Sequence, residues 1–209
     1  AINNFSEFDT EEGESVLFAS HLDEVQSLLV QGASGNYYHW QNDGKWGNGM
    51  KFLSSDTSLK IPSSVLKLDE GSIEFWFNPL WESTGTNFFI NTAGGDIYFN
   101  RTDSLLNLQM GDASVKSLTY NITSWSTNTW YHLAITWKEG SNLSLYINGV
   151  IANKTEAPII NNIGGYVFFG TDSSTSNRLA GTIDELRISS VERVPITNLT
   201  TTNFTINPN

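Results

Sequence analysis

The chain has 209 residues, of which 39% are hydrophobic and 12% aromatic, so it can bury one large core. Its formal net charge of -11 argues against nucleic acid or an anionic membrane as the partner, because both favour clusters of Lys and Arg. The absence of cysteine excludes disulfides, thiolate metal sites and a cysteine nucleophile, and no apolar stretch is long enough for membrane insertion.

Short runs of aromatic and β-branched residues, broken about every ten residues by Gly, Asn, Asp and Ser, predict an all-β protein. We interpret residues 1–13 as a lead-in segment, 14–194 as one domain and 195–209 as a trailing strand or linker. Residues 22–30 fit a short helix or an irregular loop. The predicted strands lie near residues 14–21, 36–42, 48–54, 57–61, 71–79, 87–92, 95–100, 104–110, 114–121, 129–138, 142–153, 165–170 and 179–190.

The segment from Trp130 to Val150 carries the strongest strand pattern. Apolar and polar residues alternate on both sides of residues 139–142, and the second run ends at Asn148-Gly149. This pattern predicts a β-hairpin with a marked exit turn. A second hairpin turn is expected at Gly94-Gly95.

Asp184 stands inside a later strand, GTIDELRIS, whose apolar residues should be buried. A carboxylate in such a place is costly unless it meets a cation or hydrogen-bond donors. A metal ion is the favoured partner. The alternative is that Asp184 accepts backbone N–H groups or pairs with Arg187 or Lys45.

Four segments in the same order resemble the laminin-G-like, concanavalin A-like jelly-roll family. They are GKWGNGMKF from Gly44, GSIEFWFNP from Gly71, WYHLAITW with LYINGV from Trp130, and GTIDELRIS from Gly181. The resemblance covers roughly residues 14–194. It implies two stacked antiparallel sheets, one convex and one concave, with the core between them. The family includes lectins, adhesion modules, glycosidases and spacers, so the fold alone does not define the function.

The resemblance also implies a structural calcium ion. In this family the ion is held by the Asp of the IDE strand and by backbone carbonyls, which correspond here to Asp184, a carbonyl around His21 to Asp23, and a carbonyl at Gly47 or Asn48. A site with one carboxylate and several carbonyl or water oxygens suits calcium. Calcium would stabilise the folded domain by binding only the folded state.

A glycosidase motif is present, but its position argues against catalysis. Glu7 to Glu11 spells E-x-D-x-E, the pattern of retaining glycosidases of this fold. That chemistry needs two carboxylates on one face of a regular strand. The motif here precedes the first predicted strand, and His21, His39 and His132 form no hydrolase motif. We therefore expect a non-catalytic domain.

A glycan site would use exposed aromatic rings beside polar side chains, because sugar rings stack on them. Five residues at predicted loop edges are the candidates: Tyr37, Tyr38, Trp40, Trp81 and Trp125. Packing at the rim of the core is the alternative for them. Trp76, Trp130 and Trp137 lie in dense strands and are expected in the core.

The sequence thus predicts a calcium-stabilised recognition module of a secreted or surface-exposed protein, a monomeric domain of a larger chain that binds a glycan or another surface partner. A neutral saccharide fits the acidic chain best. The alternative is a structural or protein-adhesion module without a glycan site.

The chain has a modest excess of Asn-x-Ser/Thr sequons, which indicates a glycosylated exterior. The sequons lie at Asn4, Asn100, Asn121, Asn142, Asn153, Asn198 and Asn203.

Overall fold

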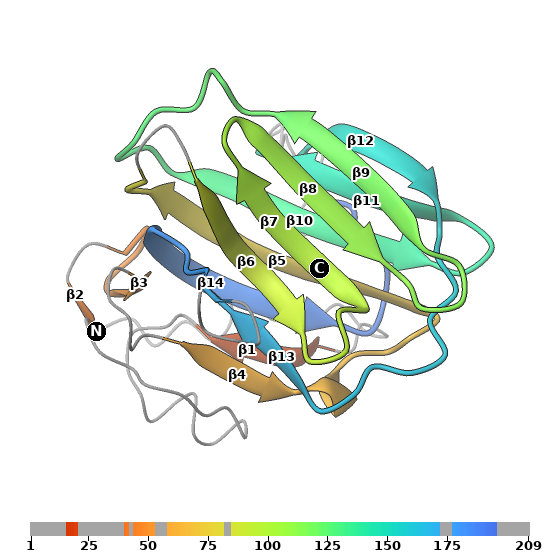
Figure 1. Ribbon diagram of the computed structural model, residues 1–209. Coiled ribbons are helices and arrows are strands. Elements are labelled where there is room, and N and C mark those ends of the chain that lie inside the picture. Colours follow the sequence, from red (N-terminus) through yellow and green to blue (C-terminus); the bar gives the residue numbers. More distant parts are fainter. Residues whose placement is uncertain are drawn as a thin grey trace, which may run out of the picture.

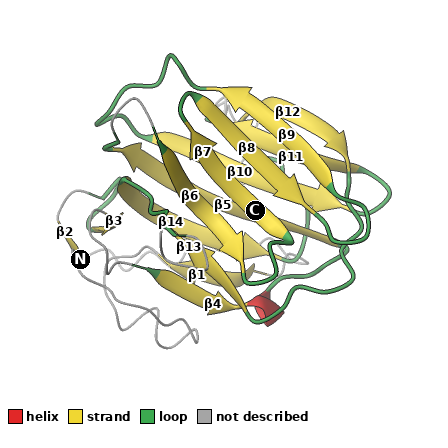
Figure 2. Cartoon of the chain, viewed as in Figure 1, coloured by secondary structure: helices red, strands yellow, loops and turns green. Residues whose placement is uncertain are grey.

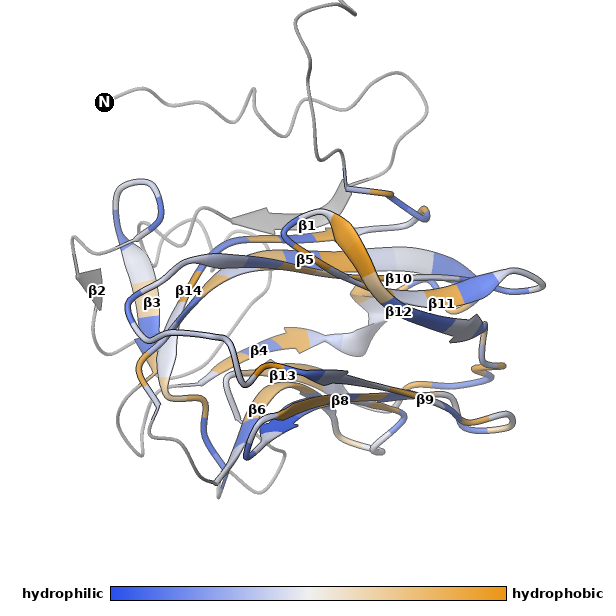
Figure 3. Cartoon of the chain, turned by 90° about the horizontal axis from the view of Figure 1, so that it is seen from above, coloured by the Kyte–Doolittle hydropathy of each residue, from blue (hydrophilic) through white to orange (hydrophobic). Residues whose placement is uncertain are grey.

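The computed structural model describes residues 44–52, 58–81, 85–171 and 177–195, together with the backbone of two further strands at 16–20 and 40–41. Two antiparallel sheets lie face to face, as the view from above shows (Figure 3). The only helix in the described part is a single 3-10 turn, η2 (Ser63–Val65), which stands out in red in Figure 2. The all-β sandwich predicted from the sequence is confirmed.

The larger sheet has eight strands in the order β12-β11-β10-β5-β14-β3-β2, with β1 also paired to β14. Its strands are β1 (Val16–Ser20), β2 (Trp40–Gln41), β3 (Gly49–Phe52), β5 (Glu70–Pro79), β10 (Tyr131–Lys138), β11 (Asn142–Ile147), β12 (Val150–Glu156) and β14 (Gly181–Ser189).

The smaller sheet has six strands in the order β4-β13-β6-β7-β8-β9 and faces the viewer in Figure 1. Its strands are β4 (Leu59–Pro62), β6 (Thr86–Thr92), β7 (Ile97–Thr102), β8 (Leu105–Met110), β9 (Lys116–Asn121) and β13 (Tyr166–Phe169).

The turn at Asn148-Gly149 divides the strand predicted at 142–153 into β11 and β12. Asn148 has φ 51° and Gly149 has φ 74°, so both central residues are left-handed, as a tight hairpin turn of this type requires. The Asn148 side chain also accepts a hydrogen bond from the His132 backbone N–H at 2.8 Å. The turn was therefore predicted correctly, but the single strand predicted at 142–153 is two strands in the structure.

The core fills the space between the sheets with aliphatic and aromatic side chains from alternate strand positions. Phe75, Phe77 and Phe99 are 0% exposed, and Trp137 is 1% exposed with its indole N–H donating to the Lys67 carbonyl at 3.1 Å. A buried indole needs such a partner, because an unpaired N–H in the core costs free energy. These buried residues mark the inward positions of each strand, and their neighbours along the strand therefore point outward.

A bulge in β14 shapes the outer face of the eight-stranded sheet. The register against β5 shifts between Asp184 and Arg187, and Glu185 in the bulge has φ 53°. Residues before the bulge pair with β3 and residues after it pair with β1. Because the bulge inserts one extra residue, Asp184 and Arg187 both lie on the outer face, opposite Trp76 and Glu74.

Candidate functional site

The outer face of the six-stranded sheet is defined by alternation and register. Leu106, Leu108 and Met110 of β8 are at most 1% exposed and point into the core, so the residues between them point outward. Direct cross-strand partners share a face, which extends this assignment to the other five strands. The outward positions are Lys60, Pro62, Thr86, Phe88, Asn91, Tyr98, Asn100, Thr102, Leu105, Asn107, Gln109, Ser117, Thr119, Asn121, Tyr166 and Phe168.

These outward positions contain no acidic residue, and Lys60 is their only charge. The chain as a whole has 22 Asp and Glu residues and a formal net charge of -11. Amides, hydroxyls and aromatic rings occupy most of the face instead. No described segment crosses in front of these strands in Figure 1. The six-stranded sheet therefore presents a nearly neutral, hydrogen-bonding surface on an acidic protein.

Tyr98 holds the centre of this face in a fixed geometry. Its ring stands edge-on to Phe88 at 4.9 Å between centroids, and its hydroxyl accepts a hydrogen bond from Asn100 Nδ2 at 3.1 Å. Asn107 Nδ2 in turn donates to Asn100 Oδ1 at 3.1 Å. Asn100 is 1% exposed, so its amide is used by its neighbours, whereas Tyr98 and Asn107 remain half-exposed. The chain of contacts orders the side chains before any ligand arrives.

One row of side chains crosses five of the six strands. Phe168, Asn91, Tyr98, Gln109 and Ser117 are successive cross-strand partners from β13 to β9. Asn91 is 7% exposed, and its Oδ1 accepts no hydrogen bond from any described residue. This oxygen has almost no solvent-accessible surface, so only a buried water or a local rearrangement can satisfy it. The row thus joins two half-exposed rings with the exposed amide of Gln109.

A third ring, Tyr166, lies beside Phe168 at the β13 end of the face. Tyr166 is 42% exposed, and its ring centroid lies 6.5 Å from that of Phe168. The Lys60 ammonium lies over the Tyr166 ring, 4.8 Å from its centroid. This cation–π contact places the single charge of the face at its edge.

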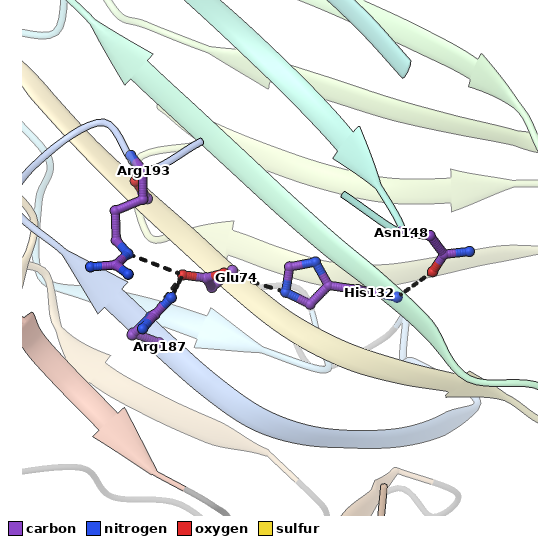
Figure 4. A network of polar contacts seen from close by, with 6 residues as sticks. Glu74, His132, Asn148, Arg187 and Arg193 are labelled. Carbon is purple, nitrogen blue, oxygen red and sulfur yellow. Dashed lines mark hydrogen bonds and ion pairs between the residues drawn. The ribbon is translucent and has the colours of Figure 1, made fainter. Parts of the chain in front are cut away.

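On the opposite side of the sandwich, the outer face of the eight-stranded sheet carries a network of charged and polar side chains (Figure 4). Glu74 accepts two hydrogen bonds from the Arg187 guanidinium, lies 3.3 Å from His132 Nε2, and lies 3.7 Å from Arg193 Nε. Burial opposes ionisation of Glu74, but the hydrogen bond from His132 and the charge of Arg187 lower its pKa overall. The side chains of Glu74, His132 and Arg187 are only 10–16% exposed. This network ties β5, β10 and β14 together.

Trp46 is the most exposed aromatic residue beside this network, at 53%. Its ring stands edge-on to Trp76 at 5.6 Å, and the Lys45 ammonium lies 4.4 Å from the Trp76 ring centroid. Trp76 is half-buried on the outer face, and its ring lies tilted against that of His132, with 5.3 Å between the ring centroids. The expectation that Trp76 lies in the core was wrong, because Phe75 and Phe77 take the inward positions of β5. Trp130 is also only half-buried.

Asp184 is completely buried and accepts backbone N–H groups. Its Oδ2 accepts from Lys45 N at 2.7 Å and Trp46 N at 3.1 Å, and its Oδ1 accepts from Glu185 N at 2.8 Å. A Cβ at Gly44 would lie 2.9 Å from Oδ2, so the loop reaches the carboxylate only with glycine there. Burial raises the pKa of Asp184 to about 7 even though these bonds favour the charged form. The predicted alternative, capping of backbone amides, is therefore present.

The other predicted calcium ligands form no complete set within the described chain. Asp184 is the single carboxylate of the expected site, and the Gly47 carbonyl accepts a hydrogen bond from Gly44 N at 3.1 Å. No group of three His, Asp or Glu side chains that could hold a metal ion occurs among the described residues. Asn48 lies in the same turn, whereas His21 and Asp23 fall outside the described residues. Calcium binding stays a prediction.

Of the predicted ligand-binding aromatics, the structure describes the side chains of Trp81 and Trp125. Trp81, Trp125 and Tyr131 form a stack, with 6.3 Å between the first two ring centroids and 4.0 Å between the last two. Trp81 also packs on the core and lies under the Arg101 guanidinium at 4.6 Å. Rim packing, the alternative interpretation, thus describes Trp81 and Trp125. Only the backbone of Trp40 is described, and Tyr37, Tyr38 and the Glu7 to Glu11 motif lie outside the described residues.

Sequence reasoning missed the face of the six-stranded sheet. A usable signal was present, because the outward positions of β7, β8 and β9 contain only Tyr, Asn, Thr, Leu, Gln and Ser, and most of the residues between them are apolar, with Arg101 and Lys116 as the charged exceptions. Counting charges separately for the two sides of each predicted strand would have separated this face from the acidic remainder. The search for aromatics in loops passed over Tyr98 and Phe168 because they stand in strands.

Comparison with protein families agrees with this architecture. A laminin G family model described as the concanavalin A-like lectin/glucanases superfamily matches residues 53–206. The chain therefore belongs to the concanavalin A-like lectin/glucanases superfamily, as its motifs indicated. A search of curated protein sequences found no significant match. No helix in the described part of the chain is long and apolar enough to cross a membrane.

Solved structures with the same fold include a domain of a bacterial arabinanase and the receptor binding domains of botulinum neurotoxins. Domain 4 of AbnA, an extracellular arabinanase from Geobacillus stearothermophilus in complex with arabinotriose, is 20% identical, with a TM-score of 0.65 over 89% of this chain and 97% of that domain. The receptor binding domain of botulinum neurotoxin C/D mosaic serotype is 19% identical, with a TM-score of 0.67 over 86% of this chain. This chain spans about half of that toxin domain, 48% of its length.

A third structure, described by the dependence of botulinum neurotoxin type C cell entry on two ganglioside molecules, is 13% identical, with a TM-score of 0.58. The match covers 77% of this chain and 43% of the toxin chain. At these identities the likeness shows the jelly-roll fold alone.

Proposed function

We propose that the domain is a non-catalytic module that binds a neutral glycan on the outer face of the six-stranded sheet. The observation that carries the proposal is the composition of that face: rings and amides without an acidic residue, on a chain with a formal net charge of -11. Sugar rings offer apolar C–H faces and hydroxyls, and such a surface complements both. An anionic partner would instead be repelled by the chain as a whole.

The proposed roles follow from the row across the sheet. Tyr98 and Phe168 stand two strands apart, or roughly 10 Å, so one oligosaccharide can contact both rings. The Gln109 side chain is exposed, and its amide extends the row with groups that can bind sugar hydroxyls. Stacking on each ring contributes about 1 kcal/mol beyond area burial, so a single site binds weakly, with a Kd near millimolar. Useful affinity then requires several copies of the module.

Lack of catalysis is part of the proposal. Glycoside hydrolysis typically uses two carboxylates that flank the scissile bond, and no outward position of the six strands carries one. Glu74 and Asp184 lie on the outer face of the other sheet, where guanidinium and backbone N–H groups occupy them. Laminarin and lichenan incubated with the domain should release no new reducing ends. Release that persists in highly purified protein would contradict this part of the proposal.

The neighbouring structures support a glycan as the ligand and an extracellular location. The arabinanase domain was solved with arabinotriose and belongs to an extracellular enzyme, and the toxin structure is described with gangliosides. By analogy we place this module in a secreted or surface-exposed protein. A bound calcium ion at Asp184, if present, would act structurally, because Asp184 belongs to the other sheet.

A glycan array probed with the domain, with and without chelator, tests the proposal. We expect binding to neutral oligosaccharides, and we expect Tyr98→Ala to weaken it. Trp46→Ala is the matched control, because it removes a more exposed ring from the turn before β3, which packs on the outer face of the opposite sheet. Binding that is lost in Trp46→Ala and kept in Tyr98→Ala would move the site to the other sheet. No binding to any glycan at millimolar concentration would favour a structural or protein-adhesion module.

A further inference from the structure

Four Asn-x-Ser/Thr sequons lie in the described part of the chain, and their side chains differ sharply in accessibility. Attachment of an N-glycan requires that the Asn amide nitrogen and the hydroxyl two residues later both be reachable from solvent. The four asparagines are Asn100, Asn121, Asn142 and Asn153. Their burial and hydrogen bonds decide which of them the folded domain can present.

Three of the four sequons are closed by the fold. Asn100 is 1% exposed, and both atoms of its amide are hydrogen-bonded within the sheet face. Asn153 Nδ2 donates to the Thr119 carbonyl at 2.8 Å, across the two sheet edges. Asn142 is half-buried, and the hydroxyl residue of its sequon, Ser144, is 2% exposed.

Asn121 differs in every one of these respects. It is exposed at the end of edge strand β9, and its Nδ2 donates no hydrogen bond to a described residue. Its Oδ1 accepts from Thr123 N at 2.8 Å and from the Thr123 hydroxyl at 2.6 Å. The two functional groups of the sequon are therefore already in contact, and the amide nitrogen is left for reaction.

We propose that Asn121 is an N-glycosylation site of the folded domain. In the reaction, Asn121 Nδ2 attacks C1 of an oligosaccharide linked to a lipid diphosphate, and the new N–C bond replaces the C–O bond to the diphosphate. The lipid diphosphate leaves, and the amide proton passes to a base of the transferring enzyme. No oxidant or reductant is needed.

The position on the sheet is compatible with glycan binding. Asn121 pairs with Leu105, which is 43% exposed, so an attached sugar has an apolar neighbour to cover. The attachment point lies four residues along β9 from Ser117 of the row and four strands, or roughly 19 Å, from β13, so the asparagine itself is well separated from Phe168 and Tyr166. A glycan on an edge strand also hinders pairing with the edge of another molecule.

The test is glycosylation of the purified, folded domain by an oligosaccharyltransferase with a lipid-linked oligosaccharide, followed by peptide mapping in a mass spectrometer. We expect a glycan on the Asn121 peptide and none on the peptides of Asn100, Asn142 and Asn153. Thr123→Val should abolish the modification, and Thr123→Ser should keep it. The denatured chain is the control, because all four sequons should then react.

An Asn121 that reacts in the denatured chain and not in the folded one would overturn the proposal. Modification of Asn100 in the folded domain would overturn it as well, because burial would then not select the site. These outcomes are independent of the proposed glycan binding, which the same preparation can be assayed for with neutral oligosaccharides.

Discussion

Asn100 donates a hydrogen bond to the Tyr98 hydroxyl at 3.1 Å, and this contact fixes an aromatic ring at the centre of an uncharged sheet face. The ring is also supported by Phe88, which meets it edge-on at 87°. A side chain held in this way loses little conformational entropy when a ligand stacks on it. Preorganisation of Tyr98 thus lowers the entropic cost of binding, so that the weak stacking energy can contribute to affinity.

We expect Tyr98→Ala to weaken binding of a neutral oligosaccharide by at least about fivefold, because it removes roughly 1 kcal/mol of stacking. Tyr98→Phe keeps the ring and loses only the bond from Asn100, so its affinity should fall less. Isothermal titration calorimetry of both variants with the same oligosaccharide measures the difference. Equal loss in the two variants would mean that the hydroxyl, and not the ring, makes the contact.

Glu74→Ala should lower the free energy of unfolding by about 3–5 kcal/mol, because it leaves the buried Arg187 guanidinium and the His132 ring without their shared carboxylate. Urea denaturation followed by tryptophan fluorescence measures this change. Thr119→Ala, at an exposed position of the other sheet, serves as the control and should be within about 0.5 kcal/mol of the parent protein. A loss below 1 kcal/mol in Glu74→Ala would contradict a supporting role for the network.

The stability of the calcium-free domain should depend on the titration of Asp184. Burial raises the pKa of Asp184 to about 7, whereas an unfolded aspartate has a pKa of about 3.9. Between these values the folded state holds a proton that the unfolded state releases, so the free energy of unfolding falls as pH rises from about 4 to about 7. Below this window the contribution of Asp184 is fully present.

The comparison with Asp184→Asn isolates this effect, because Asn does not titrate. Urea denaturation in the presence of chelator across that pH range should show a slope for the parent protein that is more negative than that of the variant by up to about 1.4 kcal/mol per pH unit. Parallel curves would show that Asp184 keeps an ordinary pKa.

Calcium, if it binds as predicted, should raise the melting temperature, and Asp184→Ala should remove most of that increase. The physical reason is that Asp184 supplies the only charge of the expected ligand set. Melting curves with calcium and with chelator test this. A melting curve unchanged by chelator, together with no metal at Asp184 in a crystal grown with calcium, would sink the prediction.

Local chemistry explains what the sequence predicted correctly. The Asn148-Gly149 turn and the alternation in Trp130 to Val150 depend on backbone preferences and on burial within single strands or hairpins. The capping alternative for Asp184 was also visible, because an apolar strand with one carboxylate requires donors. These features need no knowledge of how distant strands are paired.

The binding face could not be predicted in the same way, because it depends on pairing between strands. Asn91 and Gln109 are 18 residues apart and come into one row only through β7, and Phe168 joins them from a strand far along the chain. Trp76 was assigned to the core because alternation along β5 does not say which side faces the other sheet. The bulge at Glu185 likewise turns Arg187 to the outer face, which no periodic pattern indicates.

The most direct test of glycan binding on the six-stranded sheet is a titration of the isotopically labelled domain with a neutral oligosaccharide, followed by backbone amide chemical shifts. We expect the largest shift changes at Asn91, Tyr98, Gln109 and Phe168, which lie on four neighbouring strands. Little change is expected at Trp76 of the other sheet and at Trp46 in the turn before β3. Shift changes centred on Trp46, or on the stack of Trp81 and Trp125, would contradict the assignment of the binding face.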